Sequence, residues 1–188
     1  MSNNRIFKDS NLYSLNKSTY VNLRWIAYTG QTITILLVQF FFEYNFNYLI
    51  CLSIVFLSIL SNINLQFRVK ENQLNNSNST IYLTYDIIQL GFLFFFTGGI
   101  TNPFIFLILI PAVFSSQYLY FLNSIILVSL IIVVLALLTF FFYELPHPGE
   151  LHFHAPNYYF YTIPLSIVIG LIFLVYFGFK FGEESRIR

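Results

Sequence analysis

The chain has 188 residues, of which 57% are hydrophobic and only 9% are charged, and its mean hydropathy is +0.70. A soluble domain of this size carries roughly a quarter charged residues, so the composition predicts a membrane protein. The net charge of +1 gives no basis for a nucleic-acid partner, and a single cysteine excludes a disulfide framework and a CxxC pair.

Six apolar stretches follow one another along the chain when it is read against a window of about 20 residues. They cover residues 23–42, 48–66, 81–97, 103–118, 122–143 and 159–179. The polar run RVKENQLNNSNST, which begins at Arg68, is expected to be a loop between the second and third stretches. The fold expected is therefore an all-α membrane protein, a bundle of six transmembrane helices.

The distribution of basic residues predicts the orientation of this bundle. With six spans and both termini in the cytoplasm, every lysine and arginine falls on the cytoplasmic side, where the positive-inside rule requires them. Five or seven spans would divide them between the two sides. The expected organisation is a cytoplasmic segment at 1–22, a six-span membrane domain at 23–179 and the start of a cytoplasmic helix at 180–188. The basic residues are Arg5, Lys8, Lys17, Arg24, Arg68, Lys70, Lys180, Arg186 and Arg188.

The segment TGGITNPF, residues 97 to 104, interrupts the apolar sequence between the third and fourth stretches. Gly98 and Gly99 can adopt positive φ, and Asn102 followed by Pro103 is typical of a helix start. One interpretation is a capped turn between two helices. The other is a ligand site, because glycine N–H groups and the Asn102 amide could donate to ring carbonyls while Phe104 stacks on the ring. A quinone has this chemistry.

The same residues resemble a known family. Gly98 to Phe104 matches the GGxxNPF heptapeptide of RegB/PrrB-type redox-sensing histidine kinases. The segments that extend the resemblance are Leu23-Arg24-Trp25-Ile26-Ala27 with Gly30-Gln31, Asp86-Ile87 with Gln89-Leu90, and Glu183-Glu184-Ser185-Arg186.

This resemblance implies a homodimeric, six-span sensor in the bacterial inner membrane that senses a ubiquinone-like quinone through the heptapeptide. It implies a cytoplasmic kinase core that acts on a response regulator. No phosphoacceptor histidine segment and no glycine-rich ATP-binding region is present in the 188 residues, so this chain is expected to be a sensor module and not itself an enzyme. The redox-active cysteine of the family lies toward the kinase core and is not equated with Cys51.

Asp86 is the one ionisable residue placed clearly inside an expected span, about 18 Å along a helix from Gly98. Such a carboxylate is a functional hypothesis by default. Arg24 and Gln31 share a face of the first span, and Asp86 and Gln89 share a face of the third. We expect the pairs Arg24–Asp86 and Gln31–Gln89 to form a polar seam between these spans, with either a structural role or a role in transmission.

The segment ELPHPGELHFHAPN contains three histidines near two glutamates, which makes zinc or copper binding conceivable. No second ligand pair and no helical HxxxH spacing accompanies them, so no metal site is predicted. These weak candidates are His147, His152 and His154.

A small multi-pass transporter or a quinone-linked membrane subunit is the alternative function class. Transport is disfavoured because only one ionisable residue lies clearly inside a span and no matched pair of broken helices is evident. Haem-based electron transfer is disfavoured because the spans contain no histidine.

Overall fold

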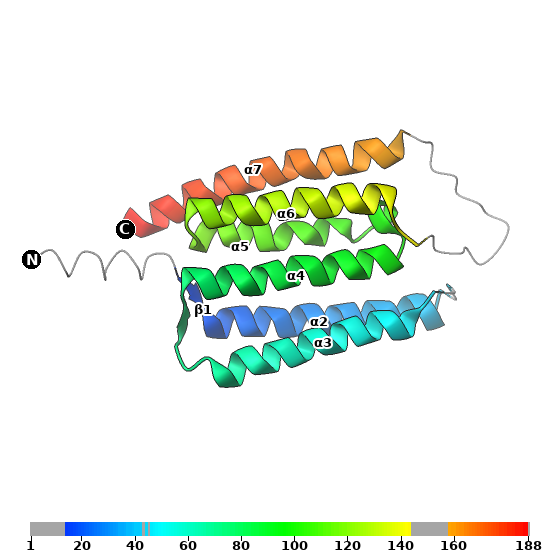
Figure 1. The fold of residues 1–188 in the computed structure, drawn as a ribbon, viewed down its shortest axis with the longest axis horizontal. Helices are drawn as coiled ribbons and strands as arrows, with labels where there is room; N and C mark the ends of the chain where they lie inside the picture. Colours follow the sequence, from blue (N-terminus) through cyan, green and yellow to red (C-terminus); the bar gives the residue numbers. More distant parts are fainter. Residues whose placement is uncertain (1–13, 43, 45, 144–157, 188) are drawn as a thin grey trace, which may run out of the picture.

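The computed structural model describes residues 14–42, 44, 46–143 and 158–187, and its α-helices run back and forth along one common axis (Figure 1). In chain order the elements are β1 (Leu15–Asn16), α2 (Lys17–Phe40), α3 (Tyr48–Arg68), β2 (Gln73–Leu74), α4 (Asn76–Phe96), the 3₁₀ helices η1 (Gly99–Thr101) and η2 (Ile105–Leu109), α5 (Ile110–Tyr118), α6 (Phe121–Phe140) and α7 (Tyr159–Ile187). All six apolar stretches are therefore helical over most of their length.

Two helices begin earlier than the hydropathy predicted. The Asn16 side chain accepts a hydrogen bond from the Thr19 N–H, and the Asn75 side chain accepts one from the Asn78 N–H. These N-caps start α2 at Lys17 instead of 23 and α4 at Asn76 instead of 81, because asparagine satisfies a free helix N–H group. The loop expected from Arg68 to residue 80 therefore ends at Asn75.

A short antiparallel pair of strands, which the sequence did not indicate, joins the segment before α2 to the segment before α4. Leu15 pairs with Leu74, and both side chains are almost completely buried. The Lys17 ammonium donates to the Val69 carbonyl at 2.6 Å, just beyond the end of α3. Cations are favourable at a helix C-terminus, so these contacts fix the relative positions of three helix ends.

The helices pack in three principal pairs, α2 with α3, α4 with α6 and α5 with α7. Two of these pairs approach closely at a glycine. A Cβ atom on Gly91 of α4 would lie 2.9 Å from the Val134 side chain of α6, and one on Gly178 of α7 would lie 1.9 Å from the Ser116 hydroxyl of α5. Absence of a side chain at these two positions lets the helices pack at short range.

The fourth apolar stretch differs most from its expected form. Instead of one α-helix over 103–118 it is η2 followed by α5, which has only nine residues. Pro111 explains the change, because in a helix that started at Pro103 it would lie in the interior and clash with the carbonyl of Leu107. With α5 beginning at Ile110, Pro111 lies in the first turn, where its missing N–H is tolerated.

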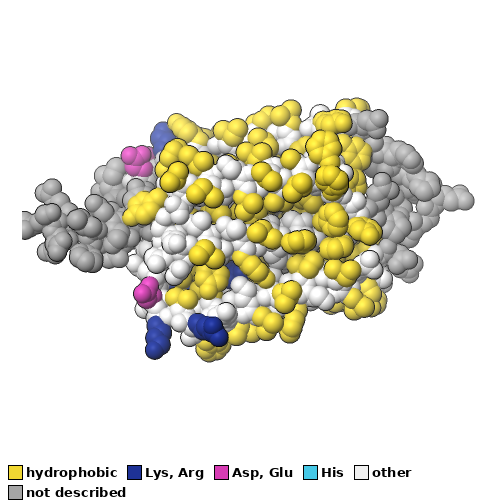
Figure 2. Space-filling view, viewed as in Figure 1, with side chains coloured by type: hydrophobic (Ala, Val, Ile, Leu, Met, Phe, Trp, Pro, Cys, Tyr) yellow, Lys and Arg dark blue, Asp and Glu magenta, His cyan; other side chains and the backbone are white. Residues whose placement is uncertain are grey.

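Four of the described helices, α3, α4, α6 and α7, are long and apolar enough to cross a membrane. The combined segment Ile105–Tyr118 is apolar but shorter, and α2 contains several polar residues, among them Arg24 and Gln31. Large apolar side chains cover the outer surface of the bundle, as Figure 2 shows. The protein is accordingly an all-α, multi-pass membrane protein.

Charged side chains gather at one end of the bundle, where α3 ends, α4 begins and α7 ends (Figures 1 and 2). Among the residues whose side chains the structure describes, the basic ones other than Arg24 belong to this end, namely Lys17, Arg68, Lys70 and Lys180. We call it the basic end, and we call the opposite end, which carries η1 and the start of α7, the turn end.

Candidate functional site: a glycine turn and a buried polar cluster

The glycine turn connects α4 to η2 at the turn end of the bundle. Gly98 and Gly99 both have positive φ, 98° and 59°, so both need the conformational freedom that glycine provides. The Thr101 and Asn102 N–H groups donate to the carbonyls of Gly98 and Gly99 at 3.2 Å each, which forms the single turn of η1. The chain thereby reverses direction within a few residues.

Asn102 holds this turn together through its side chain. Its amide nitrogen donates to the Thr97 carbonyl at 2.9 Å and to the Thr97 hydroxyl at 2.7 Å. Its amide oxygen accepts from the Phe104 N–H at 2.8 Å. The Asn102 amide nitrogen is thus bonded within the turn, whereas donation to a ligand by the glycine N–H groups stays a prediction. The geometry of Asn102 is that of a cap.

The exposed residues of the turn are Thr101, Pro103 and Phe104. Gly98 and Gly99 are buried, whereas Pro103 is exposed and Phe104 keeps 42% of its surface accessible. Phe106, one residue into η2, is 55% exposed. A ligand that reached this turn would meet the aromatic side chains of Phe104 and Phe106, while the Asn102 side chain is bonded within the turn.

Phe142 covers the inner side of the turn. A Cβ atom on Gly99 would lie 2.4 Å from the Phe142 Cβ and 2.9 Å from the Leu138 carbonyl oxygen, so glycine is required there on steric grounds as well. The Phe142 ring also stacks against Phe160 in the first turn of α7, with centroids 6.1 Å apart. The next residue, Tyr143, donates its N–H to the Phe95 carbonyl at 2.8 Å, near the end of α4. Sequence reasoning assigned Phe142 only to a span and missed this position.

The second arrangement is a buried polar cluster between α2, α3 and α4. Arg24 Nη2 lies 2.9 Å from Asp86 Oδ1, and the side chains are only 4% and 15% exposed. The Tyr20 hydroxyl donates to the other carboxylate oxygen of Asp86, and the Tyr28 hydroxyl donates to Oδ1 at 3.4 Å. The carboxylate is therefore paired and hydrogen-bonded, as a buried charge must be.

Four tyrosine rings surround the Arg24 guanidinium at 5.4 to 5.8 Å from its Cζ atom, within the range of a cation–π contact. Arg24 Nη2 also donates to the Ser61 hydroxyl of α3 at 3.3 Å, whereas Nη1 has no hydrogen-bond partner among the described residues. The rings partly compensate for that unpaired donor by facing the cation. They belong to Tyr20, Tyr28, Tyr82 and Tyr85.

A second pair extends the contact between α2 and α4. Gln89 Nε2 donates to Gln31 Oε1 at 3.0 Å, two turns along α2 from Arg24. Both contacts expected from the sequence, Arg24–Asp86 and Gln31–Gln89, are thus present.

The tyrosines around Arg24 were not anticipated from the sequence, although their spacing could have indicated them. Tyr20 and Tyr28 each lie one helical turn from Arg24 along α2. Tyr82 lies one turn before Asp86 along α4. Residues at this spacing share a face of a helix, so the faces that carry the two charges also carry three of the four rings, whereas Tyr85 directly precedes Asp86.

Other residues considered from the sequence add no further site. The weak metal candidates His147, His152 and His154 lie outside the described residues, and within the described ranges no group of three metal-ligating side chains is found. Cys51 is fully buried in α3, next to apolar residues such as Val55 and Leu93.

The fold and the buried cluster define a class, a multi-pass α-helical membrane protein with a polar seam between helices. A comparison with known protein sequences narrows this class. The chain is 30% identical over 169 residues to the sensor histidine kinase RegB of Cereibacter sphaeroides, a match that covers 89% of this chain and 37% of RegB. The similarity supports a RegB-type sensor region, and with it a two-component sensor module.

The chain spans little more than a third of the length of RegB. No protein-family model and no solved structure matches the chain.

Proposed function

We propose that this chain is the membrane sensor module of a redox-responsive histidine kinase and that it responds to the redox state of a quinone at the glycine turn. The observation that carries the proposal is the turn itself, which keeps Pro103 and Phe104 exposed while the Asn102 side chain is hydrogen-bonded within the turn. Similarity to RegB over nearly the whole chain supports the sensor class. The signal would pass to a kinase core outside these residues.

In this proposal the residues of the heptapeptide have two different tasks. Gly98, Gly99 and Asn102 shape the turn, because two of them need positive φ and the third provides its cap. Pro103 and Phe104 present the surface on which a quinone ring would lie, and the exposed Phe106 extends that surface toward an isoprenoid chain. Aromatic contacts of this kind contribute about 0.5 to 1.5 kcal/mol each beyond the area they bury.

The topology that we propose has six spans and both ends in the cytoplasm of the inner membrane. The collection of Lys17, Arg68, Lys70 and Lys180 at the basic end supports this orientation, because basic residues are retained in the cytoplasm. The glycine turn then faces the outer leaflet. A homodimer, with a cognate response regulator reached through the kinase core, completes the proposal.

The experiment is a titration of the 188-residue chain in lipid nanodiscs with oxidised and with reduced ubiquinone. We expect the Phe104→Ala variant to bind more weakly by about threefold to tenfold, which corresponds to the loss of one aromatic contact. Phe121→Ala is the matched control, because Phe121 is also exposed but belongs to the basic end, at the start of α6.

No weakening by Phe104→Ala would mean that the quinone only partitions into the lipid, and equal weakening by both substitutions would mean that the effect is not specific to the turn. Failure of the unaltered chain to bind either form would contradict the proposed ligand. Binding of both redox forms with the same affinity would contradict redox sensing, because a ligand shifts a conformational equilibrium only by its difference in affinity.

A further inference from the structure

We infer that Phe142 couples the glycine turn to α7, the helix that leaves the bundle at the basic end. The inference rests on the proposed function and names the contact through which a ligand at the turn would act. Three observations carry it, which concern Gly99, Phe160 and Pro164.

Phe142 lies against the turn at Gly99, where there is no space for a side chain. The ideal Cβ position on Gly99 is 2.6 Å from the Phe142 Cγ, so the backbone of the turn touches this side chain directly. Ile100, the next residue of η1, is completely buried. A displacement of the backbone at Gly99 toward Phe142 therefore displaces the Phe142 side chain, because the two are already in van der Waals contact.

Phe142 touches α7 on its other side. Its ring is nearly parallel to that of Phe160, with an angle of 23° between the planes, and both side chains are half-buried. Phe142 therefore contacts both the turn and the first turn of α7, and it adds an aromatic contact to the direct packing of η1 on α7. The neighbouring residue Tyr143 restrains the backbone at Phe142. Its N–H donates to the Phe95 carbonyl, and its ring packs on Phe95 and Phe96.

Pro164 makes the contacted part of α7 the part that moves most easily. Proline has no N–H to donate to the carbonyl four residues earlier, and that carbonyl belongs to Phe160. The helix is therefore less stiff between Phe160 and Pro164 than in the part of α7 that follows Pro164. A displacement of Phe160 passes into the rest of α7 through the main-chain bonds that remain across Pro164, and from there α7 is continuous to Ile187.

The test measures ligand binding and the response of α7 separately in the same chain. Spin labels are attached at Glu71→Cys and Glu184→Cys, both exposed at the basic end, in a Cys51→Ala background. The distance between them is measured in nanodiscs with oxidised quinone, with reduced quinone and without either. We expect a quinone-dependent shift in the unaltered chain, and loss of that shift in Phe142→Leu with quinone affinity kept within about twofold.

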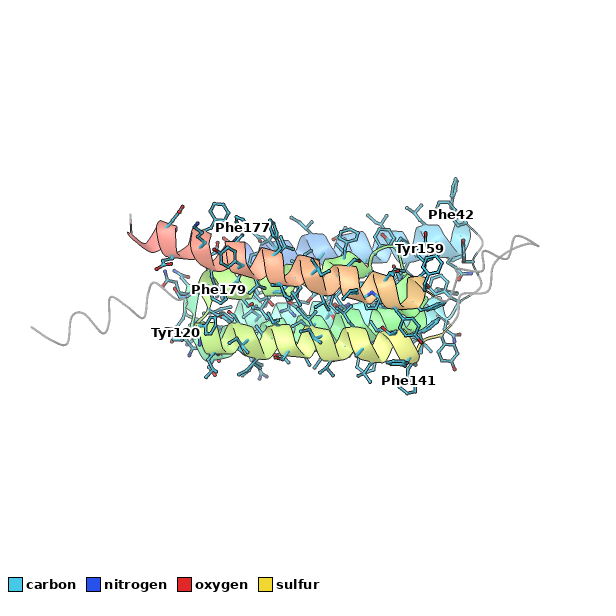
Figure 3. The ribbon with its side chains drawn as sticks, turned by 90° about the horizontal axis from the view of Figure 1, so that it is seen from above. Phe42, Tyr120, Phe141, Tyr159, Phe177 and Phe179 are labelled. Atoms are coloured by element: carbon cyan, nitrogen blue, oxygen red, sulfur yellow. The ribbon has the colours of Figure 1, made fainter. Side chains whose placement is uncertain are left out.

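Two further variants complete the design. Phe160→Leu should lose the shift as Phe142→Leu does, and the double variant should lose no more than either, because the two side chains act through one contact. Phe141→Leu is the control, because Phe141 is 63% exposed and points away from the bundle at the end where Tyr159 begins α7 (Figure 3). This variant should keep both the quinone affinity and the quinone-dependent change in the distance between the spin labels.

The outcomes separate this inference from the proposed function. A normal shift in Phe142→Leu overturns the coupling role and leaves quinone sensing intact. Loss of quinone binding in Phe142→Leu also overturns it, because Phe142 would then belong to the ligand site. No quinone binding by the unaltered chain overturns the proposed function, and the coupling role with it.

Discussion

The glycine turn and the buried polar cluster satisfy their polar groups in opposite ways. In the turn, Asn102 bonds to Thr97 and Phe104, five and two residues away. In the cluster, Asp86 bonds to Tyr20, Arg24 and Tyr28, which lie 58 to 66 residues earlier on another helix. A locally satisfied turn can present an apolar surface to a ligand without disturbing the bundle, whereas the cluster stabilises the relative position of α2 and α4.

This difference predicts where a substitution acts. Changes in the cluster should alter the stability of the whole bundle, because α2 packs mainly on α3 and depends on polar side chains for its attachment to α4. Changes in the turn should alter local geometry and ligand response, with a smaller cost in stability.

The largest effect is expected for Asp86→Ala. Removal of the carboxylate leaves the Arg24 guanidinium buried without its counter-ion, which destabilises proteins by about 3 to 5 kcal/mol. The free energy of unfolding can be measured by titration with denaturing detergent in mixed micelles. Glu71→Ala, at an exposed position, is the control and should leave it unchanged. Stability equal to that of the unaltered chain would show that the cluster contributes no net attachment between α2 and α4.

Gly99→Ala should have an intermediate effect. The new Cβ would collide with Phe142 and the residue would be held at positive φ, and together these cost about 1 to 3 kcal/mol. Gly30→Ala is the matched control, because Gly30 lies inside α2 with no atom within 4 Å of the added Cβ. It should be neutral or slightly stabilising, by up to about 1 kcal/mol. Equal effects of the two substitutions would mean that the turn tolerates a side chain at Gly99.

The smallest effect is expected for the Gln31–Gln89 pair. Side-chain hydrogen bonds between membrane helices contribute about 0.6 kcal/mol on average. A double-mutant cycle with Gln31→Leu and Gln89→Leu should give a coupling energy of this size, measured from the same unfolding titrations. A coupling energy close to that of the Arg24–Asp86 pair would mean that the seam is a single network and not an ion pair with a weaker neighbour.

Sequence reasoning located the apolar helices, the turn and both pairs of the seam, because each leaves a signal that can be read over a short window. Depth and helix face were enough to connect Arg24 with Asp86. The tyrosines around Arg24 were missed, although the helical spacing of Tyr20, Tyr28 and Tyr82 places them near the two charges; only the rotation of α2 against α4 determines that the rings surround Arg24. Phe142 was beyond such reasoning, because one phenylalanine in a run of three within an apolar stretch has no distinguishing feature. The helix starts at Lys17 and Asn76 differ from the starts expected from hydropathy, because an asparagine cap can extend a helix into polar sequence.

The shortness of η2 and α5 determines how deep the aromatic surface lies. The Tyr120 N–H donates to the Asn76 side chain, so the end of α5 is level with the start of α4. From that common level α4 extends about 31 Å, whereas α5 and η2 together extend about 24 Å. Phe106 therefore lies several ångströms below the end of α4. In a bilayer of the proposed orientation this depth belongs to the acyl chains, so a ligand of these rings arrives sideways from the lipid and its effective concentration is set by its solubility in the membrane.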